Sequence, residues 1–152
     1  MMHAVVLYQE AWSPAEDAAR LVSEELGARA IALSNRPHLN QYDLVVIATS
    51  PMGLWDPRLW AFLGSGELRG KVVAFVHDLW LPGAEAYLEA WHSLTRLSGA
   101  VVHHQPLLVS SSLLSGLSGS QRASIRAWGR ALRAEFPPPT YPHGEAGRRR
   151  VG

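Results

Sequence analysis

The sequence contains no cysteine among its 152 residues. This absence excludes disulfide bonds, a thiolate nucleophile, and zinc or iron–sulfur sites with cysteine ligands. The 14 basic and 13 acidic residues leave a net charge of +1, which gives no bulk electrostatic reason to expect a nucleic-acid partner. No apolar run approaches the roughly 18 residues that a membrane span requires. The N-terminus lacks the basic start and cleavage site of a signal peptide. We therefore expect a cytoplasmic globular domain with no membrane segment.

Short continuous apolar runs alternate along the chain with segments of helical spacing. A run of apolar residues that does not alternate with polar ones is typical of a strand buried on both faces. Helices are predicted where apolar residues recur every three or four positions. The expected strands cover 3–8, 30–33, 43–49, 71–77 and 101–109, and the expected helices cover 13–26, 59–63, 84–97 and 118–136. Pro106 lies inside the fifth strand, which therefore is an edge strand or contains a bulge.

Five such strands interleaved with helices predict a parallel sheet with helices on both faces. Ligands of these sheets bind beyond the carboxyl ends of the strands, where the strand order reverses. Three loops follow the relevant strands, at 9–15, 50–56 and 78–83. We expect any ligand site to be formed by these loops.

The order of segments resembles the flavodoxin family over residues 3–135. The similar features are a strand ending at Tyr8, a capped helix beginning near Ser13, and the runs YDLVVIAT, KVVAFV and LEAWHSLTRLSGAVV. The resemblance implies an α/β flavodoxin-like three-layer sandwich, with a five-stranded parallel sheet of order 2-1-3-4-5. It also implies bound FMN and a role in electron transfer or as a small flavin or quinone reductase. The domain would cover residues 1–136, followed by a flexible tail over 137–152.

The same resemblance assigns the cofactor-binding residues to the three loops. The first loop would hold the FMN phosphate, the second the flavin ring, and the third its pyrimidine edge. The residues so implied are Glu10, Ala11, Trp12, Ser13 and Ala15, then Ser50, Met52, Gly53 and Trp55, and finally Asp78, Trp80 and Gly83. Trp55 either stacks on the flavin or caps the core beneath its loop.

The first loop departs from the family's hydroxyl-rich phosphate loop. Pro14 removes one backbone donor, and Glu10 adds a carboxylate that would repel a phosphate dianion. A second hypothesis is therefore a flavin-free interaction module with the same fold. Its binding surface would be the tryptophan-bearing loops or a basic helix face formed by Arg122, Arg126, Arg130 and Arg133. The spacing of these four arginines also fits a merely solvated face. A redox partner protein and a homodimer are compatible with either hypothesis.

Three histidines are candidates for proton transfer or metal binding. His77 ends the fourth strand and is either a proton donor at the site or a structurally satisfied histidine. His103 and His104 are adjacent in a predicted strand, which would send their rings to opposite faces. They therefore should not chelate one ion together, and no spacing typical of a metal site occurs in the sequence.

Overall fold

The computed structural model describes residues 2–10, 13–50, 56–79, 83–112 and 115–139. Six of the loop residues predicted for the cofactor lie outside this part of the chain: Ala11, Trp12, Met52, Gly53, Trp55 and Trp80. The side chain of Ser13 and the predicted tail from residue 140 onward are also outside it.

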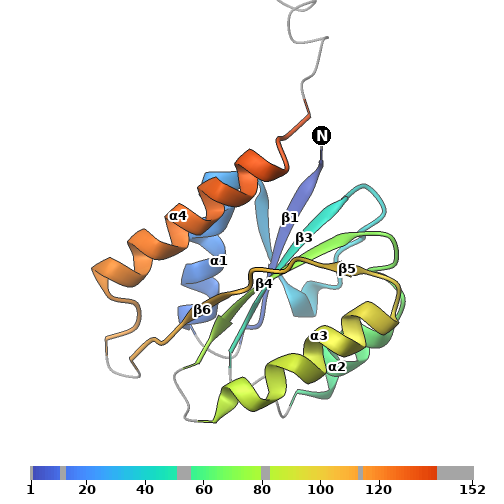
Figure 1. Cartoon of the computed structure of the whole chain (residues 1–152), viewed down its shortest axis with the longest axis horizontal. Coiled ribbons are helices and arrows are strands. Elements are labelled where there is room, and N and C mark those ends of the chain that lie inside the picture. The colour runs from blue at the N-terminus through green and yellow to red at the C-terminus, as the bar shows by residue number, and fades with distance from the viewer. Residues whose placement is uncertain (1, 11–12, 51–55, 80–82, 113–114, 140–152) are drawn as a thin grey trace, which may run out of the picture.

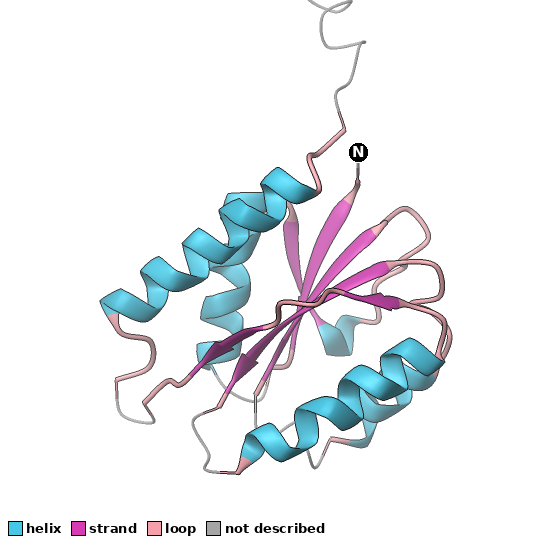
Figure 2. Ribbon diagram, in the orientation of Figure 1, coloured by secondary structure: helices cyan, strands magenta, loops and turns pink. Residues whose placement is uncertain are grey.

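A parallel sheet forms the centre of the molecule (Figure 2). Its strand order is β2-β1-β3-β4-β5, and a sixth strand, β6, also pairs with β4. Every strand pair is parallel. The strand order and the parallel pairing confirm the predicted parallel sheet of order 2-1-3-4-5. The strands are β1 (Ala4–Tyr8), β2 (Arg29–Ala32), β3 (Leu44–Thr49), β4 (Val72–Asp78), β5 (Val101–Val102) and β6 (Leu107–Val109).

Helices cover both faces of the sheet (Figure 1). Helices α1 (Ser13–Leu26) and α4 (Gly119–Glu135) lie together on one face, and α2 (Pro57–Gly64) and α3 (Leu88–Leu97) lie on the other. Alternate residues of each buried strand enter opposite cores: Val46 packs with α1 and α4, whereas Val45 packs with α2 and α3. Among the described residues, no helix is long and apolar enough to cross a membrane.

The fifth predicted strand is broken in two. β5 pairs with the start of β4 and β6 pairs with its end, so residues 103–106 interrupt a single edge path along β4. Pro106 has no backbone N–H to donate to a ladder, and it lies directly before β6. The predicted edge position is confirmed, whereas the prediction of one continuous strand over 101–109 was wrong.

Side-chain hydrogen bonds lie in the first turns of both long helices of the first face. Ser118 caps α4, and its capping box with Gln121 is complete. In α1, the carboxylate of Glu16 accepts hydrogen bonds from Tyr8 and Arg20. The part of the predicted capping box that depends on the Ser13 side chain lies outside the described residues.

The connection from β2 to β3 contains no α-helix, unlike those from β1 to β2, from β3 to β4 and from β4 to β5. Residues 33–43 are all described and hold a single short 3-10 turn, η1 (Leu33–Asn35). Leu39 of this connection is buried against the α2–α3 core, and Tyr42 packs at its edge. The sheet face beside β2 is therefore covered by a loop rather than by a helix.

Candidate functional site

The carboxyl ends of β1 and β3 are joined by a buried side chain. The backbone amide of Ser50 donates to Gln9 Oε1 at 3.0 Å, and Gln9 is only 3% exposed. β1 and β3 are neighbours in the sheet, but α1 follows β1 on one face and α2 follows β3 on the other. The strand order reverses at this point, so the Gln9–Ser50 hydrogen bond marks the root of the expected ligand crevice.

Glu10, the first predicted phosphate-loop residue, is turned toward β2. Its Oε1 accepts a hydrogen bond of 3.2 Å from the backbone amide of Ser34 in η1. Ala15, predicted in the same loop, is buried in the first turns of α1 with 1% exposure. Among the described residues of this loop, Glu10 is therefore hydrogen-bonded to η1, the turn that follows β2, and Ala15 belongs to the core.

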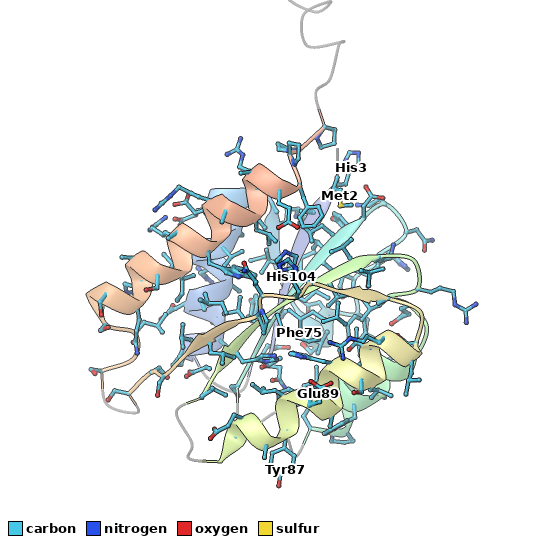
Figure 3. The ribbon with its side chains drawn as sticks, in the orientation of Figure 1. Met2, His3, Phe75, Tyr87, Glu89 and His104 are labelled. Carbon is cyan, nitrogen blue, oxygen red and sulfur yellow. The ribbon has the colours of Figure 1, made fainter. Side chains whose placement is uncertain are left out.

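A buried row of polar side chains crosses from β3 to α3. His77 Nδ1 lies 2.7 Å from Thr49 Oγ1, and His77 Nε2 lies 2.9 Å from His92 Nε2. His77 has no exposed surface, and its ring stacks between those of Phe75 and Trp91 at centroid distances of 5.0 and 5.7 Å. Figure 3 shows Phe75 between the sheet and α3.

Burial, together with the neighbouring His92 ring, lowers the pKa of His77 to about 3. Burial also lowers the pKa of His92, against the opposing effect of Glu89. His77 is therefore neutral near pH 7 and has no proton to donate as an acid from a charged form. Of the two alternatives for His77, the geometry supports the structurally satisfied histidine, because the ring is buried and both its nitrogens have partners.

Asp78, predicted at the pyrimidine edge, ties the third loop to the turn after β6. Its Oδ1 accepts from the backbone amide of Ser111 at 3.0 Å, and its Oδ2 accepts from the Ser111 hydroxyl at 2.5 Å. Both residues are buried. Gly83 in the same loop has a φ of 83°, a left-handed conformation that glycine adopts without steric cost.

A pocket of about 830 Å³ opens between η1 and α2. Gln9 and Glu10 reach it from β1, and it extends along α2 as far as Ser65 and Glu67. Its remaining lining residues are Leu33, Ser34, Arg36, Pro37, Asp56, Arg58, Ala61 and Phe62. It therefore meets the β1 side of the crevice and continues onto the face that lacks a crossover helix.

The basic face of α4 is occupied within the molecule. Arg126 pairs with Glu24 at 3.0 Å and with Glu25 at 3.3 Å, and Arg130 also pairs with Glu25 at 3.3 Å. Arg122 lies 3.8 Å from Asp17, and Arg133 donates to the Glu25 carbonyl oxygen. These arginines thus pair with the acidic side of α1, while the side chains of Arg122, Arg126 and Arg130 keep 39–60% exposure. The solvated interpretation therefore agrees with the structure, and partner binding by this face stays a prediction.

His103 and His104 are not on opposite faces. Their ring centroids are 4.7 Å apart, because they lie in the interruption between β5 and β6 and not in a strand. His103 Nε2 lies 2.8 Å from the Glu135 carboxylate, so this turn is joined to the end of α4.

The described part of the site brings together some residues that the sequence pattern had indicated and others that it had not. Glu10, Ser50, Asp78 and Gly83 stand at the carboxyl edge as predicted. The partners Gln9, Thr49, His92 and Ser111 were missed as functional or positioning residues. A polar residue directly after a buried strand is a usable signal for Gln9, whereas nothing in the local sequence pairs His92 with His77.

Solved structures that are similar to this chain include flavodoxins and a putative flavoprotein. Flavodoxin 1 from Bacillus cereus superposes with a TM-score of 0.68 at 17% identity, over 89% of this chain and 99% of that one. A WrbA-like flavodoxin from Agrobacterium tumefaciens gives 0.67 at 17% identity, over 86% and 94%. A short-chain flavodoxin associated with a non-canonical PDU bacterial microcompartment gives 0.64 at 16% identity, over 89% and 99%.

No family model matches the sequence, and no curated protein sequence matches it. The chain has a flavodoxin-like fold, as its strand order and these superpositions show together.

Proposed function

We propose that this protein binds FMN in the crevice at the carboxyl ends of β1, β3 and β4, and that it acts in electron transfer or as a small flavin or quinone reductase. The observation that carries the proposal is the strand-order reversal between β1 and β3, held closed at its root by the Gln9–Ser50 hydrogen bond. In flavodoxin, a sheet of order 2-1-3-4-5, FMN binds at this reversal. The similar solved structures are named as flavodoxins, which supports the same cofactor.

The described residues fit an anionic cofactor better than the sequence suggested. In the sequence, the Glu10 carboxylate near the expected phosphate position counts against the binding of an anionic cofactor. In the structure this carboxylate is bound to the Ser34 amide on the β2 side. The Asp78 carboxylate is buried and accepts two hydrogen bonds from Ser111. Both carboxylates are therefore engaged by hydrogen bonds from the chain.

The role of each segment follows from its position. The start of α1 would receive the phosphate, because the first N–H groups of a helix have no partner within the helix. The loop after Ser50 would flank the ring, and the loop from Asp78 to Gly83 would hold the pyrimidine edge. Bound FMN would supply the electron-transfer chemistry, and the chain would bind the cofactor, orient it and exclude water.

Binding is tested by titrating the purified protein with FMN and following the quenching of flavin fluorescence. We expect a micromolar dissociation constant, equivalent to about 8 kcal/mol of binding free energy. Glu10→Gln should tighten FMN binding about threefold or more, because it removes a negative charge from the phosphate loop. Riboflavin lacks the phosphate, so its affinity should not change.

Glu24→Gln is the matched control, since it removes the same charge from the far half of α1. It should leave the affinity for FMN unchanged. Protein that neither carries a yellow cofactor nor quenches FMN fluorescence contradicts the proposal, and the flavin-free module then becomes the better hypothesis.

A further inference from the structure

The pocket between η1 and α2 exists because the β2–β3 connection has no helix. In a parallel sheet, a crossover helix normally covers the face beside its strands. Here residues 33–43 contribute only η1 and a loop, and a pocket of about 830 Å³ remains between them and α2. This volume is within the range of small-molecule sites, roughly 300–1,000 Å³.

Gln9 lines the pocket and presents a side-chain amide nitrogen to it. Gln9 is 3% exposed, and its side-chain oxygen is used by the Ser50 amide. In the part of the chain that the structure describes, its amide nitrogen donates no hydrogen bond. A ligand in the pocket that carries an acceptor oxygen would give this N–H group a hydrogen-bond partner.

Arg36 stands at the same pocket in a strained backbone conformation. Its φ of 45° and ψ of 63° place it in the left-handed region, and it is the one residue other than glycine with positive φ in the described chain. It also precedes Pro37, which further restricts its backbone. Such strain is concentrated at functional sites. No ion pair of its guanidinium occurs among the described residues.

The walls between these groups suit a flat ring. Leu33, Pro37 and Phe62 supply apolar surface, and Phe62 offers an aromatic face. Asp56 caps α2 and also accepts from the Arg58 side chain, while Glu10 accepts from Ser34. Glu67 accepts from the Ser65 hydroxyl. Each carboxylate of the lining therefore already has a donor from the chain, whereas Gln9 and Arg36 have donors to offer.

We infer that this pocket binds a planar ring compound that carries a ring carbonyl and an anionic substituent. The carbonyl oxygen accepts from the Gln9 amide, the ring lies against Phe62 and Pro37, and the anionic group pairs with Arg36. The site does not depend on FMN binding in the crevice. FMN itself has ring carbonyls and a phosphate, so the test must separate a distinct ligand site from an extension of the FMN site.

The probe is anthraquinone-2-sulfonate, which has two ring carbonyls and one sulfonate. Anthracene-2-sulfonate is its matched control, because it has the same ring and charge without the carbonyls. Isothermal titration of the FMN-free protein should show about tenfold tighter binding of the quinone. Gln9→Met should remove that difference between the two probes, since it removes the amide donor.

Arg36→Gln should weaken both probes about tenfold, whereas Arg29→Gln, which removes the same charge from an exposed position in β2, should change neither. Arg36→Gly should weaken both probes as well without lowering the melting temperature, because glycine adopts positive φ freely. Saturating FMN should leave the affinity for the quinone unchanged.

Equal affinities of the wild-type protein for the two probes would overturn the inference. Equal effects of Arg36→Gln and Arg29→Gln would also overturn it, and this comparison is available even if Gln9→Met does not fold. Displacement of the quinone by FMN would show that the pocket belongs to the flavin site. Failure of FMN to bind refutes the proposed function alone, because the probes are measured without FMN.

Discussion

The buried His77–His92 pair makes the stability of this fold depend on pH in a predictable way. His77 has no exposed surface, and its two ring nitrogens face Thr49 and His92. Its pKa is about 3 in the folded protein, because burial disfavours the charged ring and His92 adds to this effect. In the unfolded chain the pKa of a histidine is about 6.5. Acid therefore protonates the unfolded state first.

The sign and size follow from linkage. Above pH 6.5 the ring is neutral in both states, so the full stability is present. As the pH falls from about 6.5 toward 3, the unfolded state binds a proton that the folded state rejects, and stability is lost. For His77 alone this loss is about 2 kcal/mol at pH 5 and about 3 kcal/mol at pH 4. The lowered pKa of His92 acts in the same direction.

The assay is equilibrium urea unfolding at pH 7 and pH 5, with His77→Gln as the test variant. Glutamine cannot titrate in this range, so the decrease in unfolding free energy between the two pH values should be about 2 kcal/mol smaller than in the wild type. His104→Gln, at an exposed position, is the control and should keep the wild-type decrease. Equal decreases in the wild type and His77→Gln would refute the reasoning. If His77→Gln does not fold, the ring ¹⁵N shifts of His77 in the wild type should not change between pH 7 and pH 5.

Three other predictions concern packing and charge, and each is checked by thermal or urea unfolding. Gly129→Ala should destabilise the protein by about 1 kcal/mol, because the new Cβ would lie 3.0 Å from Glu25 Cβ. This steric cost should outweigh the better helix propensity of alanine. A stabilised variant would show that the α1–α4 contact can open. Ser111→Ala should cost about 1–3 kcal/mol, since the buried Asp78 carboxylate loses its shortest hydrogen bond, and an unchanged melting temperature would contradict this role. Glu25→Gln should cost less than about 1 kcal/mol at low salt, because its pairs with α4 arginines such as Arg130 are partly exposed, and the cost should vanish at high salt.

The arrangement of strands and helices was predictable because its signals are local. The run from Leu44 to Ala48 is apolar without alternation, and it lies in β3, which is buried at every position. Ser118 lies at the start of a helical pattern and caps α4 as expected. The sequence also predicted the edge of the sheet at which polar residues gather, because all parallel strands end at the same edge.

The partners of those polar residues were not predictable from spacing. Arg126 and Glu25 are 101 positions apart, and only the packing of α4 on α1 brings them into contact. The His103 and His104 rings approach each other because the edge strand breaks before Pro106, a detail that strand periodicity does not contain.

The sequence alone was enough to predict that this chain, without cysteine, folds as a parallel α/β sheet with loops after β1, β3 and β4 as its candidate ligand loops. These properties depend on residues a few positions apart, whose apolar spacing and turn chemistry are read directly. Three features could be seen only in the tertiary structure. They are the ion pairs of the α4 arginines, the burial of a neutral His77, and the pocket with Gln9 and Arg36 beside α2. Each of these depends on contacts between residues far apart in the chain, which form only when the two helical layers close on the sheet.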